Sequence, residues 1–208
     1  MEQKEKRDES VRQILEAATA VFAKEGFSGA RVDEIAKRAG VNKAMIYYRI
    51  GDKHTLYSEV IHSLFGEIGS AIKGNIPEDA EPEEKLKSYI RGLTRTIAEH
   101  PYLPGIMMCE LASGGENISE IVANDFAGIL AIPGKIVTEG INKGVFIKTN
   151  PMILHMIIVG FMMFFRTTEP VRKKYSAILP DTMKCVENKS VSDGMMDIEK
   201  LILRAIKI

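Results

Sequence analysis

The sequence is short of cysteine, of net charge and of long apolar runs, and each shortage excludes a class of protein. Its 208 residues include two cysteines, Cys109 and Cys185, which lie far apart and form no C-x-x-C metal or redox motif. Basic and acidic side chains number 28 each, so the overall charge indicates neither a nucleic acid nor an anionic membrane as partner. Any basic patch must therefore be local.

Signals for a membrane or for secretion are also missing. The most apolar run, residues 152–165, is shorter than the roughly 20 residues that span a bilayer. The first ten residues, MEQKEKRDES, lack the apolar segment of a secretory signal. We therefore expect a cytoplasmic protein with free thiols and no membrane partner, in which residues 152–165 form a buried helix.

Groups arranged for catalysis or metal binding are not found either. The sequence has no catalytic carboxylate pair, nucleophile elbow or glycine-rich phosphate loop. Cys109 and Glu110 are adjacent, so on a helix they face different sides. His155 lies among methionines but has no second histidine at helical ligand spacing. We therefore expect no enzyme, no cofactor and no metal.

What the sequence does contain is helical periodicity along most of its length, with no convincing run of alternating strand residues. The pattern predicts an all-α fold of about nine helices, with residues 73–85 as a polar linker and 170–190 as an irregular stretch. The helices are expected near residues 7–25, 32–39, 43–50, 53–72, 86–99, 105–115, 116–142, 152–168 and 192–206.

Local signals mark several helix ends. Gly26 ends the first helix as C-terminal glycines do, and Asn42 and Asp52 are placed to cap the next helices through their side-chain oxygens. Asn150, followed by a proline, begins the apolar helix near residue 152. Pro133 should kink or interrupt the helix that contains it.

The second and third helices have helix-turn-helix spacing. Ala36 is small where two helix axes approach, Gly40 supplies a left-handed turn, and Ile46 anchors the next helix. Residues 43–49 then present basic and aromatic side chains, a surface that a DNA major groove accepts. Residues 1–53 carry eleven Lys and Arg against nine Asp and Glu, a net charge of +2. The spacing also fits three helices that only pack together, with half-buried tyrosines.

Residues 14–61 resemble the N-terminal domain of the TetR family of transcriptional regulators. The matching motifs are A-x-x-x-F-x-x-x-G-F, V-x-x-I-A-x-x-A-G-V and I-Y-Y…D-K-x-x-L-Y, in that order. Later, GVFIKTNP (144–151) is similar to the turn before that family's eighth helix. The sequence departs from the family at Ala30 and Arg31, where a threonine or serine usually begins the second helix.

The resemblance implies which side chains meet DNA. The first three residues of the recognition helix face the bases, the tyrosine pair and the arginine follow, and Lys53 grips a phosphate. Arg31 is a further candidate for a phosphate contact. The expected DNA-binding residues are Arg31, Asn42, Lys43, Ala44, Met45, Tyr47, Tyr48, Arg49 and Lys53.

The resemblance also implies a homodimer that binds a palindromic operator on double-stranded DNA, as a repressor released by a small apolar or aromatic effector. Residues 1–53 would form the DNA-binding domain, and residues 54–208 the effector-binding and dimerisation domain. The helices at 152–168 and 192–206 are the expected dimer seam, with Gly160 allowing close approach. The apolar helix at 152–168 is equally suited to the centre of one subunit's core.

Methionine and aromatic side chains beyond the N-terminal third are the candidates to line an effector cavity, because methionine adapts to irregular apolar shapes. The same side chains can equally fill a solid core. The expected ligand-binding residues are Phe65, Tyr89, Met107, Met108, Phe126, His155, Phe161, Met162 and Phe165. Polar candidates for orienting a ligand are Tyr89, His100, Tyr102, Cys109, Glu110, Asp125 and His155.

Two other functions stay open at this point. One is an α-helical ligand-binding protein or enzyme whose helix-turn-helix no longer reads DNA, although the sequence offers no catalytic groups for it. The other is a DNA-binding protein with a solid C-terminal core and no effector.

Overall fold

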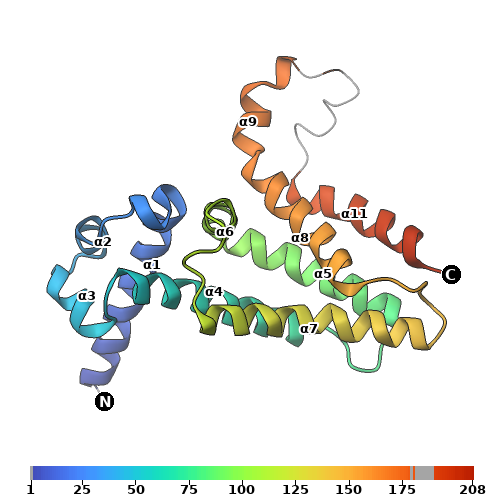
Figure 1. Cartoon of the computed structure of the whole chain (residues 1–208), viewed down its shortest axis with the longest axis horizontal. Helices are drawn as coiled ribbons and strands as arrows, with labels where there is room; N and C mark the ends of the chain where they lie inside the picture. The colour runs from blue at the N-terminus through green and yellow to red at the C-terminus, as the bar shows by residue number, and fades with distance from the viewer. Residues whose placement is uncertain (1, 179, 181–189) are drawn as a thin grey trace. The chain divides into compact units, whose positions relative to one another are not determined.

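The computed structural model describes residues 2–178, 180 and 190–208, which form an all-α fold as expected (Figure 1). This part of the chain contains ten α-helices, one 3₁₀ helix and no strand beyond an isolated bridge between Phe146 and Lys207. The elements are α1 (Glu2–Gly29), α2 (Val32–Ala39), α3 (Lys43–Arg49), α4 (Lys53–Gly74), α5 (Pro82–Glu99), α6 (Leu103–Ala112), α7 (Glu120–Asn142), α8 (Pro151–Thr167), α9 (Glu169–Lys174), η1 (Ser176–Ile178) and α11 (Val191–Ile206).

Contacts divide the chain into two compact units. The first unit consists of Met1–Gly66 and Tyr102–Asp125, and the second of Glu67–Pro101 and Phe126–Ile208. Helices α4 and α7 each contribute residues to both units. The expected boundary between a DNA-binding domain (1–53) and an effector-binding domain (54–208) is a functional division, and it stays a prediction.

The first unit has its core between α1, α4 and α6. Helix α1 carries an apolar stripe that includes the buried Ile14, Ala18 and Phe22. Gly26 has φ 67° and ψ 178°, so the helix breaks there, as expected, before one more turn runs to Gly29. Helix α6 approaches α1 closely, since a Cβ added to Gly105 would lie 3.0 Å from the Ala23 carbonyl oxygen.

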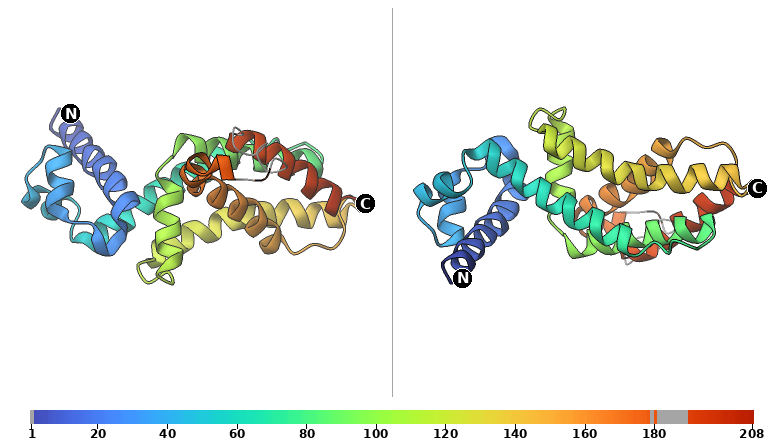
Figure 2. Two further views of the ribbon diagram at one scale, coloured as in Figure 1. Left: turned by 90° about the horizontal axis from the view of Figure 1, so that it is seen from above. Right: turned by 90° about the horizontal axis from the view of Figure 1, so that it is seen from below.

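Helices α2 and α3 form the expected helix-turn-helix, which lies beside α1 (Figure 2). Gly40 adopts the left-handed conformation, with φ 67° and ψ 26°. The Asn42 side chain accepts a hydrogen bond from the Ala44 N–H at 2.9 Å, and Asp52 Oδ1 accepts one from the Thr55 N–H at 2.8 Å. Both expected caps are therefore confirmed.

The second unit is built around α5, α8 and α11, which pack against one another (Figures 1 and 2). A glycine allows the close approach of α11 to α8, since a Cβ on Gly194 would lie 3.0 Å from Phe161 Cζ. Arg91 on α5 pairs with Glu199 on α11 at 3.0 Å. The expected start of α8 is confirmed, because Asn150 Oδ1 accepts the Met152 N–H at 2.9 Å.

Helix α7 continues through Pro133, so the proline does not interrupt the helix. Among the described residues, α7 alone is long and apolar enough to cross a membrane by length and composition, with a mean hydropathy of 1.4. Core helices of soluble proteins also have this length and composition.

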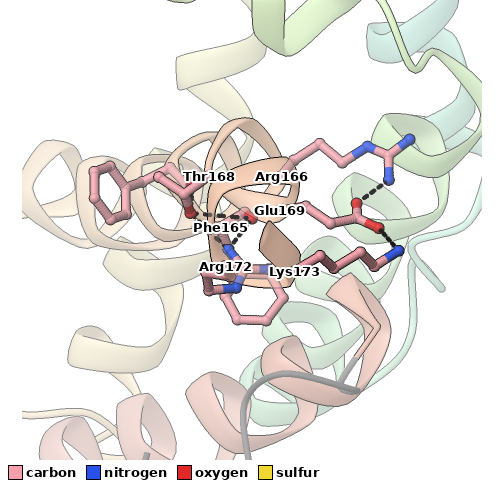
Figure 3. A network of polar contacts seen from close by, with 7 residues as sticks. Phe165, Arg166, Thr168, Glu169, Arg172 and Lys173 are labelled. Atoms are coloured by element: carbon pink, nitrogen blue, oxygen red, sulfur yellow. Dashed lines mark hydrogen bonds and ion pairs between the residues drawn. The ribbon is translucent and has the colours of Figure 1, made fainter. Parts of the chain in front are cut away.

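Helix α9 and the short helix η1 correct the expectation of an irregular stretch at 170–190 for residues 170–178, while residues 179 and 181–189 lie outside the described part of the chain. Figure 3 shows the polar contacts between the end of α8 and α9. Glu169 accepts hydrogen bonds from Arg166 at 2.5 Å and from Lys173 at 2.8 Å. Arg172 donates to the Phe165 carbonyl oxygen, and its guanidinium lies 3.9 Å from the centre of the Phe165 ring. These ion pairs and the cation–π contact, rather than apolar periodicity, stabilise α9.

Candidate functional site

The outer face of α3 is open to solvent. Ile46 is buried and anchors the helix, whereas Tyr47 is 48% exposed and Tyr48 is 86% exposed. Ala44 and Met45, near the start of the helix, are exposed as well. Two large aromatic rings in solvent are costly for a helix that only packs, because each forgoes the burial of its apolar surface. The face therefore has the character of a binding surface.

Lys43 is the first residue of α3, and its ammonium is held by a partner from the preceding helix. Lys43 Nζ lies 2.9 Å from Asp33 Oδ2. The hydrogen bond to Asp33 raises the pKa of Lys43, so the side chain is a full cation at neutral pH. Asp33 was not among the residues singled out from the sequence for DNA binding.

Lys53, at the start of α4, is packed rather than freely extended. Its ammonium lies 4.7 Å from the centre of the Phe27 ring and 3.3 Å from the Ser28 carbonyl oxygen. Partial burial lowers the pKa of Lys53. The end of α1 therefore fixes the position of the cation that the family resemblance assigns to a phosphate.

The two arginines of the expected surface differ in their surroundings. Arg31 occupies the N-cap position of α2, makes no side-chain cap hydrogen bond and is exposed, so its guanidinium is available to a ligand. Arg49, in the last turn of α3, is half-buried, and within the described part of the chain its Nε has no hydrogen-bond partner.

A buried polar network behind this surface was only partly foreseen. Glu110 of α6 is 2% exposed, and its carboxylate accepts hydrogen bonds from the Tyr57 hydroxyl at 2.9 Å and the Asn117 N–H at 2.8 Å. The Tyr57 ring packs against Phe22 and Phe27 with centroids 4.8 and 5.2 Å away. Burial and the hydrogen bond to Glu110 raise the pKa of Tyr57, so the hydroxyl stays a donor. In the sequence, the signal for this network was Tyr57 itself, which ends the motif D-K-x-x-L-Y.

In the second unit, several expected effector residues come together. The Tyr89 hydroxyl lies 2.6 Å from His155 Nδ1, and the Phe126 ring centroid lies 6.0 Å from that of His155. Burial lowers the pKa of His155 and raises that of Tyr89, so both are neutral at pH 7. Phe161 and Phe165 stack on each other along α8 at 5.2 Å. The Tyr89–His155 pair thus combines a polar contact with the apolar ring of Phe126, and Phe161 and Phe165 form a second aromatic pair on α8.

The remaining expected effector residues are distributed differently. Met162 is buried in the second unit, with its sulfur 3.8 Å from the Thr94 hydroxyl. Phe65, Met107 and Met108 belong to the first unit, and their role as effector residues stays a prediction.

A groove of about 540 Å³ runs between α5 and α11 in the second unit. None of the nine expected effector residues lines it. Its walls are Ile90, Arg91, Thr94, Arg95, Ala98, Val191, Ser192, Met195, Met196, Glu199 and Lys200.

Comparison with known proteins identifies the architecture. Residues 14–60 match the family described as "Bacterial regulatory proteins, tetR family", and residues 79–189 match "Tetracyclin repressor-like, C-terminal domain". The chain belongs to the TetR family. It is a DNA-binding transcriptional regulator of the helix-turn-helix type and not an enzyme, as the sequence predicted.

Relatives within the TetR family extend over most of the chain. The transcriptional repressor NicS of Pseudomonas putida is 25% identical over 202 residues, which are 93% of this chain and 91% of NicS. The fatty acid metabolism regulator protein of Bacillus subtilis is 29% identical over 132 residues, 64% of this chain and 68% of that protein. The solved structure of FadR from Bacillus subtilis in complex with stearoyl-CoA has the same fold, with a TM-score of 0.72, 22% identity and coverage of 92% and 97%.

Proposed function

We propose that this TetR-family chain is a cytoplasmic homodimeric repressor that binds a palindromic operator and is released by a small apolar or aromatic effector. Residues 1–53 read the DNA, and residues 54–208 bind the effector and pair the subunits. The observation that carries the proposal is the exposed face of α3, where aromatic and cationic side chains stand outside a buried anchor. A repressor is favoured because NicS, which aligns over most of the chain, is itself a repressor.

The reading surface uses two kinds of contact. Tyr47, Tyr48 and Lys43 lie on or at the start of α3 and reach base edges and thymine methyls, which carry sequence information. Lys53 and Arg31 bind phosphates, which fix the register of the helix in the groove. One seven-residue helix contacts few base pairs, so two copies on a palindrome are needed for specificity.

An apolar stripe on α8 supports pairing with a second copy of the chain. Exposed apolar side chains recur along this helix at the spacing of one face, and the exposed Gly160 leaves room for a partner helix. A second copy is the fitting occupant because an isologous pair presents two reading heads to a two-fold operator. The exposed side chains are Met152, Ile153, Met156, Ile157 and Phe164.

The effector is proposed to bind in the second unit near the Tyr89–His155 pair. The neighbouring ring of Phe126 offers apolar surface, and the neutral polar pair offers one point of orientation. A ligand with an apolar chain has precedent in FadR from Bacillus subtilis, whose solved complex contains stearoyl-CoA. Phe65, Met107 and Met108 remain candidates for the same ligand.

The reading surface is tested by operator binding. Genomic fragments retained by the purified protein supply the operator, and fluorescence anisotropy then measures affinity at several salt concentrations. Lys53→Ala should weaken binding to all fragments, Tyr47→Ala should weaken operator binding, Lys43→Ala should alter sequence preference, and log affinity should fall linearly with log salt. Tyr102→Ala, which removes a ring of similar exposure on the first unit, is the matched control. Wild-type affinity in Tyr47→Ala and Lys53→Ala would refute the assignment.

The effector is tested by a thermal-shift screen of apolar and aromatic compounds. A ligand at about 100 times its Kd stabilises the protein by roughly 2.7 kcal/mol, enough to raise Tm measurably. Compounds that raise Tm should also release the operator, because an effector shifts the protein between two forms by its different affinity for them. A regulator with a solid core and no effector would show no Tm shift with any compound.

A further inference from the structure

We propose that Asp33 determines operator specificity by acting through Lys43. Its carboxylate holds the Lys43 ammonium in an ion pair. Lys43 then breaks this pair to bind an operator base with good hydrogen-bond acceptors, but does not break it to bind an arbitrary phosphate. Asp33 is thus a positioning residue of the reading surface. The inference rests on the proposed role of Lys43 in reading DNA.

The geometry joins the two helices of the helix-turn-helix. Asp33 is the second residue of α2 and Lys43 the first of α3, and Lys43 Nζ lies 2.9 Å from Asp33 Oδ2. The Asp33 side chain is 71% exposed and the Lys43 side chain 43% exposed, so both are accessible to DNA. A lysine side chain is a flexible four-carbon chain and lacks the rigid planar guanidinium group of arginine. A fixed ion-pair partner therefore removes much of its freedom to reach neighbouring phosphates.

The Asp33–Lys43 ion pair is weaker than a good lysine–base contact and comparable to a single phosphate contact, which is the order needed for Lys43 to be released selectively at operator bases. An exposed ion pair contributes at most about 5-fold to an equilibrium constant and is weakened by salt. A lysine that contacts both guanine O6 and N7 discriminates against other bases by about 5- to 150-fold, which exceeds the cost of leaving Asp33. A single screened phosphate contact is comparable to the ion pair it replaces, so little is gained on non-operator DNA. The negative charge of Asp33 opposes such binding further.

Two simpler roles for Asp33 need to be separated from this one. Asp33 lies in the first turn of α2, where a carboxylate stabilises the helix dipole. It also repels phosphates as any exposed acid near DNA does. Glu34 is the matched control for both, because it lies in the same turn, carries the same charge and is exposed, while Asp33 is the residue hydrogen-bonded to Lys43.

The experiment compares wild type with Asp33→Asn, Glu34→Gln, Lys43→Ala and the double variant Asp33→Asn/Lys43→Ala. Anisotropy titrations use the operator and a scrambled duplex of equal length, from low to high KCl, after circular dichroism has verified folding. Asp33→Asn should bind the scrambled duplex about 2- to 5-fold more tightly per subunit, with less change at the operator, so the specificity ratio falls. Its salt slope on the scrambled duplex should steepen by about one per new phosphate contact.

The controls decide the outcome. Glu34→Gln should keep the wild-type specificity ratio, and Asp33→Asn should have no further effect on that ratio in the Lys43→Ala background. The proposal is overturned if Asp33→Asn keeps the wild-type ratio, if Glu34→Gln lowers it equally, or if the effect persists without Lys43. Absence of operator binding by wild type, or wild-type affinity in Tyr47→Ala, would instead refute the proposed function.

Discussion

One hydroxyl group connects the core behind the reading surface to α6. The Tyr57 ring is buried among α1 aromatics, and its hydroxyl is one of the donors that satisfy the buried Glu110 carboxylate. A buried carboxylate that loses a donor bears an uncompensated desolvation cost. The pair is therefore a point where a change of one atom has a measurable effect on folding.

Tyr57→Phe removes that atom and keeps the ring. We expect the free energy of unfolding to fall by about 1–3 kcal/mol, because Glu110 stays buried with fewer hydrogen bonds. Urea unfolding followed by circular dichroism measures the change. Tyr102→Phe, at an exposed position in the same unit, should leave the unfolding midpoint unchanged. Equal midpoints for the two variants would show that the hydroxyl contributes nothing.

His62 gives the first unit a pH-dependent contribution to stability. His62 Nδ1 lies 2.6 Å from Asp125 Oδ2, and this hydrogen bond, with the nearby charges of Asp125 and Glu59, raises the pKa of His62. A raised pKa means that the folded state holds the proton more tightly than the unfolded state. The contribution is full below the unfolded pKa of about 6.5 and is lost as the pH rises through the folded value.

The expected result is a stability difference between wild type and His62→Gln that is largest near pH 5.5 and shrinks towards pH 8.5. The His62 side chain is 40% exposed, so solvent screening limits the difference to about 0.2–1 kcal/mol. Urea titrations at both pH values measure it. Asp125→Asn should remove the pH dependence while leaving the histidine in place. A difference that grows with pH would contradict the assigned sign.

At the scale of elements, local signals predicted the helix ends well. Gly40, Asn42 and Asn150 act in the structure as their residue types indicate, because caps and left-handed turns depend on one or two neighbouring residues. Helix α9 escaped prediction because its cap residue Thr168 makes no side-chain cap bond and its stability comes from ion pairs and a ring contact with the end of α8. Apolar periodicity carries no signal for such contacts.

The two asparagine caps allow a matched test of the recognition helix. Asn42→Ala and Asn150→Ala each remove a cap whose oxygen accepts a backbone N–H at 2.9 Å, so each should cost about 1 kcal/mol of stability. Only Asn42→Ala should also weaken operator binding, because only α3 begins the reading surface. Parallel unfolding and anisotropy measurements separate the two effects. Equal loss of operator affinity in both variants would mean that the cap acts through global stability alone.

At the scale of the molecule, the sequence predicted the class of fold and the family. Helix order and the quoted motifs are local properties and are confirmed. Whether effector candidates from different helices line one cavity depends on which helices pack together, and the periodicity of a single helix carries no signal for that, so the grouping of Phe65 with Phe126 stays a prediction. Helix α8, which the sequence analysis expected in a dimer seam or at the centre of one subunit's core, buries one face and exposes an apolar face in the single chain.

That exposed face predicts the assembly state. Wild type should have twice the chain mass of 23.1 kDa by size-exclusion chromatography with light scattering. Met156→Glu places a carboxylate in the apolar stripe of α8, where pairing would bury it unpaired, so the variant should run as a single chain and bind operator weakly. Leu111→Glu, at a similarly exposed position on α6, should keep the wild-type mass. A wild type of 23.1 kDa at micromolar concentration would refute the dimer.

The first compact unit is assembled from two stretches of chain, with residues 67–101 assigned elsewhere between them. This matters for biosensor engineering, in which the operator specificity of one regulator is transplanted onto the inducer response of another. A hybrid spliced at a single point near residue 66 would pair α1 with a foreign α6 and leave Tyr57 without its own carboxylate. Hybrids that transfer residues 102–125 together with the N-terminal segment should be the ones that fold and respond.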